Sequence, residues 1–182
     1  NDLNIKNNDI IAIFLLSSFS KIHKSFQSAA ILYSYGLEDD VHILFRTMFE
    51  NLFISTSIKK NKNNYEKLIK NQEIEDCQKT NDLIDLGLLK QTKIKINHRD
   101  KTKIWEFANE ADLSNIFSAY TYLSSYVHLD LRNLEKNIDK NEDEISAICI
   151  SPSVNNIGDV FTEMIGLLLT SIDTIKNYST KN

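Results

Sequence analysis

The sequence predicts an all-α protein, a single helical bundle of about five to six helices over residues 1–182. Two observations lead to this fold class. First, four glycines and one proline leave too few turn residues for a sheet of many strands. Second, apolar residues recur at three- and four-residue spacing along several long segments, as they do on the buried face of a helix. A chain of this length can bury one sizeable core, so no second domain is required.

Composition argues against several classes of protein. Hydrophobic residues make up 42% of the chain and charged residues 25%, as in ordinary globular domains. The net charge of −4 argues against a surface that is basic all over. The two cysteines form no Cys/His metal spacing, and no apolar run is long enough to cross a membrane. We therefore expect a cytoplasmic protein that has no metal site, no cofactor and no contact with a membrane.

The first two predicted helices form a hairpin. The apolar pattern from Asn8 to Tyr35 predicts the first helix, and Gly36 predicts its end. The second helix is expected from about Glu38 to Lys60, because it begins with three carboxylates and ends where the apolar pattern stops. Within it, nine of the fourteen residues from Val41 to Ile54 are apolar, so this stretch should form the centre of the core.

The middle of the chain is more polar. Residues Tyr65 to Leu89 predict an exposed helix with a break near Asn81 and an end near Gly87. The segment from Lys90 to Lys103 then holds six Lys or Arg residues and one Asp. Such a segment is either a solvated loop or an arm that faces phosphate groups, and the sequence leaves both interpretations open.

Two further helices are expected after this basic segment. Ile104 to Asn109 predicts a short helix that fills the core through Trp105 and Phe107. A longer helix should follow from Asp112 to about Leu131, where apolar residues form a clear stripe.

The end of the chain predicts one short extended element and one last helix. Ile145 to Ile150 is short, apolar and followed by the proline, which is typical of an extended segment or a small hairpin. Val154 to Tyr178 predicts a final core helix. We expect the first helical hairpin to pack against the 112–131 helix and against this final helix.

Polar residues stand on two of the predicted apolar helices. Arg46 and Glu50 lie one turn apart on the second helix, and a buried guanidinium needs such a partner. Tyr120, Ser124 and His128 follow one edge of the 112–131 helix at spacings of four residues. If these two helices pack together, the polar groups meet.

This constellation allows two roles. One is metal-independent RNA cleavage, in which His128 exchanges a proton and Arg46 stabilises the phosphate while Glu50 positions Arg46. Tyr120 or Ser124 would then hold a phosphate oxygen. In that role, further substrate contacts are expected from Lys95 and Arg99 of the basic segment. The other role is a buried structural network with no substrate.

The remaining histidines are weaker candidates. We expect His42, one turn before Arg46, to lie at a helix edge rather than to bind a ligand. His98 and His23 lie beside Arg or Lys residues and are expected to face water.

Three short motifs carry a resemblance to known proteins. They are Gly36-Leu37, Arg46-Thr-Met-Phe-Glu50, and Tyr120 through Ser124 to His128. Together they resemble a group of uncharacterised bacterial helical proteins, which are in turn similar to the HEPN-like helical bundles of toxin–antitoxin and antiviral defence systems. The resemblance implies a HEPN-like fold and, in its active members, a metal-independent ribonuclease that acts at a homodimer interface.

The chain departs from the active HEPN-like proteins in one respect. Those enzymes carry arginine before histidine on a single helix, whereas His42 precedes Arg46 here and His128 precedes Arg132. Activity would therefore require Arg46 and His128 to come together from two helices or two subunits. The sequence thus predicts a HEPN-like defence or toxin protein that binds RNA or a nucleotide, with or without cleavage. The alternative is a noncatalytic helical module that assembles with a partner protein.

Overall fold

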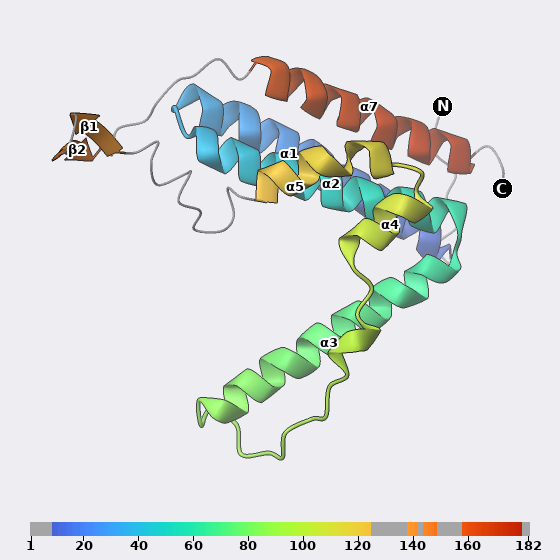
Figure 1. The fold of residues 1–182 in the computed structure, drawn as a ribbon. Coiled ribbons are helices and arrows are strands. Elements are labelled where there is room, and N and C mark those ends of the chain that lie inside the picture. The colour runs from blue at the N-terminus through green and yellow to red at the C-terminus, as the bar shows by residue number, and fades with distance from the viewer. Residues whose placement is uncertain (1–8, 125–137, 142–143, 149–157, 180–182) are drawn as a thin grey trace.

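The computed structural model describes residues 9–124, 138–141, 144–148 and 158–179 (Figure 1). These residues form an α-helical bundle, which confirms the predicted fold class and number of helices. The helices and strands are α1 (Ile10–Ser34), α2 (Glu38–Lys60), α3 (Asn63–Asp85), α4 (Ile104–Glu110), α5 (Phe117–Ser124), α7 (Gly158–Ser179), two 3₁₀ turns (His98–Asp100 and Ser114–Ile116), β1 (Ile138–Asn141) and β2 (Glu144–Ile148).

The ends of α1 follow from local chemistry. At its start the Asp9 carboxylate accepts a hydrogen bond from the Ala12 amide at 3.0 Å, which is the usual role of an N-cap aspartate. At its end Gly36 has a φ of 74°, and the Leu37 amide donates back to the Leu32 carbonyl at 3.1 Å. Glycine suits this left-handed position because it has no Cβ, so the chain turns directly into α2.

The helix α2 lies at the centre of the bundle. It contacts α1, α7, α4 and α5, and Figure 1 shows α1 and α7 running alongside it. Phe45, Met48 and Leu52 are each at most 2% exposed. The predicted packing of the first hairpin against α5 and the final helix is therefore confirmed. The buried apolar cluster comprises Ile22, Ala29, Val41, Phe45, Met48, Phe49, Leu52, Phe53, Phe107, Ala108, Tyr120, Leu123, Met164 and Leu167.

The helix α3 projects away from this bundle (Figure 1), and Asn64 is its one buried residue. The predicted break near Asn81 is wrong, because α3 continues to Asp85. Asparagine weakens a helix when its side chain bonds to nearby backbone, whereas the Asn81 amide bonds instead to the distant backbone of Ile94. Beyond α3, Gly87 has a φ of 71° and turns the chain back, as its sequence position predicted.

The short helix α4 contributes Phe107 and Ala108 to the core. Phe107 is 2% exposed, whereas Trp105 is 51% exposed, so the prediction that both residues plug the core is wrong. The reason is geometric. Residues that are two apart in an α-helix differ by about 200° around its axis, so residues 105 and 107 point to opposite sides.

The next helix begins later than the sequence predicted. Asp112 has a φ of 57° and ends α4, and the Leu113 amide donates to the Ala108 carbonyl at 2.9 Å. An aspartate can take this left-handed position when its side chain finds a partner, and here the carboxylate pairs with Lys60. The helix α5 therefore starts at Phe117 after a 3₁₀ turn, and its predicted continuation to Leu131 lies outside the described residues.

The strands β1 and β2 pair with each other in an antiparallel hairpin. The strand β2 coincides with the start of the predicted extended element at residues 145–150. The final helix is described from Gly158, and residues 154–157 of its predicted span lie outside the described part. None of the helices that the structure describes combines the length and apolar character needed to cross a membrane.

Candidate functional site

Arg46 and Glu50 form an ion pair on α2. Their side chains lie one turn apart, with the Arg46 Nη2 atom 2.9 Å from the Glu50 Oε1 atom. The phenylalanines of α2 occupy the buried face of the helix, so this pair falls at the edge of that face and keeps some contact with solvent. The Arg46 side chain is 23% exposed and the Glu50 side chain 33%.

Tyr120 of α5 joins the pair. Its hydroxyl accepts a hydrogen bond from Arg46 Nη2 at 3.1 Å and donates one to Glu50 Oε1 at 3.0 Å. The Arg46 Cζ atom also lies 5.3 Å from the centre of the Tyr120 ring, within the range of a cation–π contact. The three side chains therefore form a closed triangle, which we call the Arg46 cluster.

The electrostatics keep Tyr120 neutral. Burial raises the pKa of Tyr120 above its ordinary value of 10.0, although the hydrogen bond from Arg46 acts in the opposite direction and Glu50 adds to the rise. A neutral phenol can donate and accept at once, so its protonated form is what holds Arg46 and Glu50 together.

The Arg46 cluster borders a cavity of about 380 Å³, which we call the Arg46 pocket. The Arg46 Nε atom is buried and has no hydrogen-bond partner among the described residues. The pocket lies where α2 meets α3 and the chain that returns along it. Its polar lining consists of Arg46, Glu50, Asn71, Gln72, Glu75, Lys101 and Thr102, and its apolar lining of Ile54, Leu68, Ile104 and Phe107.

The basic segment 90–103, which we call the basic arm, is fastened along α3. The Asn71 amide donates to the Thr102 carbonyl and accepts from the Thr102 amide, both at 2.8 Å. Asn81 makes the same pair of bonds with Ile94, also at 2.8 Å. Each asparagine side chain thus bonds as the backbone of a neighbouring strand would, and it satisfies the N–H and C=O groups of one residue of the arm.

Ion pairs reinforce these contacts. Lys101 lies 2.6 Å from Glu75 and Lys93 lies 2.6 Å from Asp85, measured between nitrogen and carboxylate oxygen. Because Lys101 and Glu75 both line the Arg46 pocket, the arm forms one wall of it. The charges of the lining therefore balance, with two cations against two carboxylates.

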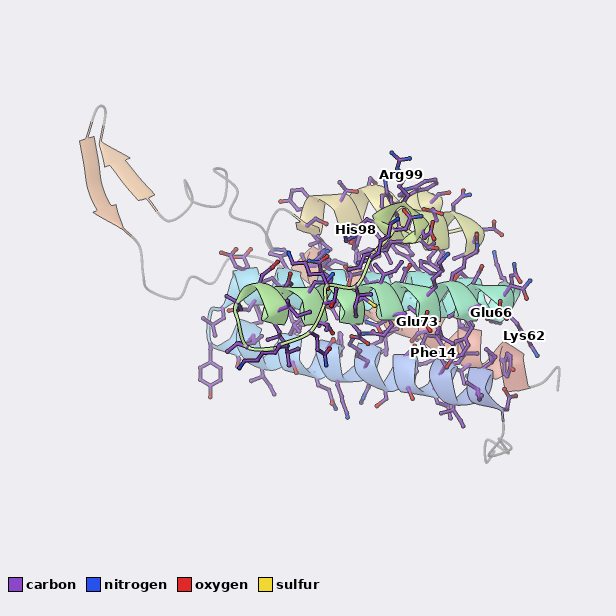
Figure 2. All side chains as sticks on the ribbon, turned by 90° about the horizontal axis from the view of Figure 1, so that it is seen from below. Phe14, Lys62, Glu66, Glu73, His98 and Arg99 are labelled. Carbon is purple, nitrogen blue, oxygen red and sulfur yellow. The ribbon has the colours of Figure 1, made fainter. Side chains whose placement is uncertain are left out.

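The two arm residues predicted to bind substrate lie outside this wall. Lys95 and Arg99 are exposed and do not line the pocket. Arg99 points away from the body of the protein in Figure 2. The ion pairs among the described residues include neither of them. The arm is thus solvated along much of its length, and it also borders the pocket through Lys101 and Thr102.

The remaining members of the predicted constellation are placed differently. The Ser124 hydroxyl donates to the Tyr120 carbonyl at 3.0 Å, so it bonds to the backbone of its own helix and not to the Arg46 cluster. His128 lies outside the described residues. The structure therefore brings together Arg46, Glu50 and Tyr120.

Sequence patterns missed several residues at the site. Asn71, Glu75 and Thr102 reach the pocket through the fold of the arm, and no motif marks them. The cationic run marked the arm but did not distinguish Lys101 from its neighbours. Within the described residues, no group of His, Cys, Asp and Glu side chains is arranged to hold a metal ion.

The histidines show one further correction. His42 is 5% exposed and its Nε2 atom lies 3.6 Å from Glu38 Oε1, so it is buried and not at an open helix edge as predicted. Its side chain lines a cavity together with residues of α5 and α7, and the periodicity of α2 alone cannot show these tertiary neighbours. His23 and His98 are exposed, as predicted.

Comparison with known proteins gives one match. The profile of a family of unknown function, DUF5677, matches residues 12–145. The matched span holds the Arg46 cluster, α3 and the basic arm. No curated protein and no solved structure matches the chain.

Proposed function

The chain belongs to the DUF5677 family, and we propose that it is a HEPN-like protein of a bacterial toxin or phage-defence system that binds RNA or a nucleotide at the Arg46 pocket. One observation carries this proposal. The Arg–Glu motif of α2 and the cationic arm, which are far apart in the sequence, border the same cavity. The cavity is lined by both polar and apolar side chains, a combination that suits a ligand with a ring and hydrogen-bonding edges.

The unused donor of Arg46 supports binding of an anionic or carbonyl oxygen. A guanidinium has five N–H groups in a planar fork, and Glu50 and Tyr120 both bond to the Nη2 end. The Nε atom is buried without a partner among the described residues, and such a donor is costly to leave unsatisfied. A phosphate or base oxygen could accept from Nε without displacing Glu50, and this requires the side chains that cover Nε to move.

The arm supports a polynucleotide more than a single nucleotide. Lys95 and Arg99 are exposed on a segment that ends at the pocket wall, and exposed cations attract the phosphate backbone without regard to sequence. A strand with one nucleotide in the pocket would have its flanking phosphates near these residues.

Cleavage is the further step of this proposal. It requires a group that moves a proton near neutral pH, and His128 is the residue we assign to it. Arg46 would stabilise the negative charge that develops on the phosphate. His128 would come from the same chain or from the second copy of a homodimer.

A second candidate is the noncatalytic module that assembles with a partner protein. It is favoured by the closed geometry of the Arg46 cluster, in which each of the three side chains bonds to the other two. In that role the cluster would hold α5 against α2 and bind no ligand.

Binding of a short labelled single-stranded RNA to Arg46→Ala, measured by fluorescence anisotropy at low salt, separates the candidates. We expect the variant to stay folded and to bind about tenfold more weakly or worse, since a lost charge-assisted bond costs that much. Lys101→Ala should also weaken binding, whereas Lys24→Ala on α1 is the matched control and should not. Unchanged RNA binding together with a loss of stability of about 3–5 kcal/mol in Arg46→Ala would favour the structural module.

Cleavage is tested in cells. We expect growth inhibition and discrete fragments of total RNA on expression of the wild type, and neither with His128→Ala at equal protein levels. Healthy growth and intact RNA with both proteins would contradict cleavage, and the proposal would then be limited to RNA or nucleotide binding.

A further inference from the structure

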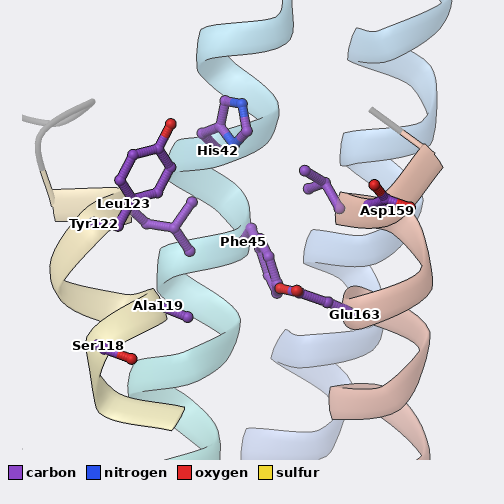
Figure 3. Close-up of a pocket in the computed structure, with 9 residues that line it drawn as sticks. His42, Phe45, Ser118, Ala119, Tyr122, Leu123, Asp159 and Glu163 are labelled. Atoms are coloured by element: carbon purple, nitrogen blue, oxygen red, sulfur yellow. The ribbon is translucent and has the colours of Figure 1, made fainter. Parts of the chain in front are cut away.

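A second cavity, of about 390 Å³, lies between α2, α5 and α7 (Figure 3). In this view Phe45 of α2 lies between two walls, with Leu123 and Tyr122 on α5 and with Asp159 and Glu163 on α7. We call this cavity the Glu163 pocket. It shares no lining residue with the Arg46 pocket and is not part of the function proposed above.

The inner surface of the Glu163 pocket is apolar and well supported. Phe45 is 2% exposed and Leu123 is 3% exposed, and Ala119 and Val160 complete the apolar lining. Residues held this firmly by the core present a preformed surface, and the volume is that of sites that bind small molecules. The pocket therefore suits an apolar group of modest size.

The wall on α7 carries unbalanced negative charge. Asp159 and Glu163 are four residues apart on one helix, where like charges repel each other. The ion pairs among the described residues include neither of these carboxylates.

The described segments around the pocket contain no lysine or arginine, and the basic side chain in the lining is His42, which lies 3.6 Å from Glu38. Residues 25–45, 117–124 and 158–166 are the described parts of α1, α2, α5 and α7 around the pocket and the turn between α1 and α2. They contain five carboxylates and no lysine or arginine. The five are Glu38, Asp39, Asp40, Asp159 and Glu163. A positively charged ligand would relieve this repulsion, and an anion such as a phosphate would increase it.

We propose that the Glu163 pocket binds an organic cation, an ammonium or guanidinium group carried on an apolar stem. The cationic group pairs with Glu163 and Asp159, and the stem packs on Phe45 and Leu123. The Tyr122 ring, which is 60% exposed at the rim, adds a face on which a cation can lie. Such a group belongs either to a free amine or to a lysine or arginine side chain of a polypeptide.

Titration with phenethylamine tests the proposal. Binding is followed by amide chemical shifts in the full chain, with 2-phenylethanol as a neutral ligand of similar shape and 3-phenylpropionate as an anion. We expect shifts at Phe45, Leu123 and Glu163 with the amine, an affinity about tenfold lower or worse for the alcohol, and no binding of the anion. Equal affinities for the amine and the alcohol, or no binding of the amine, would overturn the proposal.

A pair of variants on α7 makes the test specific. Glu163→Gln removes the charge of an exposed residue in the pocket, and Asp173→Asn removes the same charge from an exposed residue of α7 outside the pocket lining. Neither change touches the core, so both proteins should fold. We expect about a tenfold loss of amine affinity in Glu163→Gln and no change in Asp173→Asn. Equal affinity in the two variants would contradict the assigned site.

Competition distinguishes the two sources of the cation. A synthetic peptide of residues 90–103 carries six cationic side chains beside the apolar residues Ile94 and Ile96. If the peptide displaces phenethylamine in the wild type, the pocket accepts side chains of a polypeptide, including those of a second copy. Amine binding that the peptide does not reduce supports a pocket for free amines.

Discussion

The bundle and the outer arm are stabilised by different interactions. The bundle of α1, α2 and α7 buries large apolar side chains, and the rings of Phe49 and Phe53 lie 5.6 Å apart within it. The outer arm, which we define as α3 and residues 86–103, buries Asn64 alone on its helix and is fastened by asparagine amides and ion pairs. Burial of apolar surface provides most of the free energy of folding, so the bundle should set the global stability. The polar contacts set where the arm lies.

The Arg46 pocket lies where these two regions meet. Arg46 and Glu50 come from the packed helix α2, whereas Lys101 and Thr102 come from the arm. One wall is therefore rigid, and the other can open at a cost below that of global unfolding. A ligand that contacts both walls would be held mainly by α2 and enclosed by the arm.

The largest expected effect separates the core of the bundle from the outer arm. Phe53 is fully buried and packs on Phe49, Phe117 and Tyr120. We expect Phe53→Ala to lower the free energy of unfolding by about 3–5 kcal/mol, because the cavity it leaves cannot close. Leu88→Ala, at a residue of the arm that is 68% exposed, is the control and should change it by less than about 0.5 kcal/mol. Chemical denaturation measures both, and equal losses would mean that the arm shares the core.

The second effect concerns the joint between the regions. Asn64 is fully buried at the start of α3, and its Nδ2 donates to the Ser57 carbonyl of α2 at 3.2 Å. We expect Asn64→Ala to cost about 1–2 kcal/mol in chemical denaturation, because a buried hydrogen bond is lost. The neighbouring Asn63→Ala is the matched control, since Asn63 is exposed and bonds to Asn61 through its backbone amide. If Asn64→Ala were as stable as Asn63→Ala, the joint would not depend on this hydrogen bond.

The third effect is a pH dependence at the start of the bundle. The pKa of Asp9 lies below its ordinary value of 3.8, first because the carboxylate accepts from the Ala12 amide and further because the Tyr178 hydroxyl donates to it. A lowered pKa in the folded state contributes stability above about pH 4, and this contribution is lost as the pH falls through the folded value. We expect Asp9→Ala to cost about 0.5–1 kcal/mol at pH 7 and less at pH 3. Thermal unfolding at both pH values checks this, and a loss independent of pH would exclude the carboxylate as the cause.

The sequence predicted the bundle better than the outer arm for a physical reason. The bounds of α2 follow from its apolar period and its terminal charges, and the Arg46–Glu50 pair follows from four-residue spacing. These signals are local. The side-chain hydrogen bonds of Asn71 and Asn81 join residues that are distant in the sequence. A local pattern does not reveal such bonds, so the predicted helix break at Asn81 was wrong.

Two further errors concern the direction of side chains. Trp105 was expected in the core on hydrophobic character alone, although Phe107 already occupies the inward side of α4. His42 is buried and lines a cavity with residues of α5 and α7, and these neighbours depend on tertiary structure. Local spacing therefore predicted the Arg46–Glu50 pair of the candidate site. The pocket wall that the arm forms could be identified only from the folded structure.

The smallest global effect is expected at the asparagine contact that holds the arm. Asn81→Ala removes both bonds to the backbone of Ile94, so that segment should open more often while the bundle stays intact. Because two partly exposed hydrogen bonds are lost, we expect hydrogen exchange at the Ile94 amide to accelerate about tenfold. Global stability should change by less than about 0.5 kcal/mol. Gln78→Ala is the control, since Gln78 bonds only along its own helix to Asp82. If Asn81→Ala unfolded the whole protein at lower denaturant, the arm would belong to the same cooperative unit as the bundle, and the adjustable wall of the Arg46 pocket would be rigid after all.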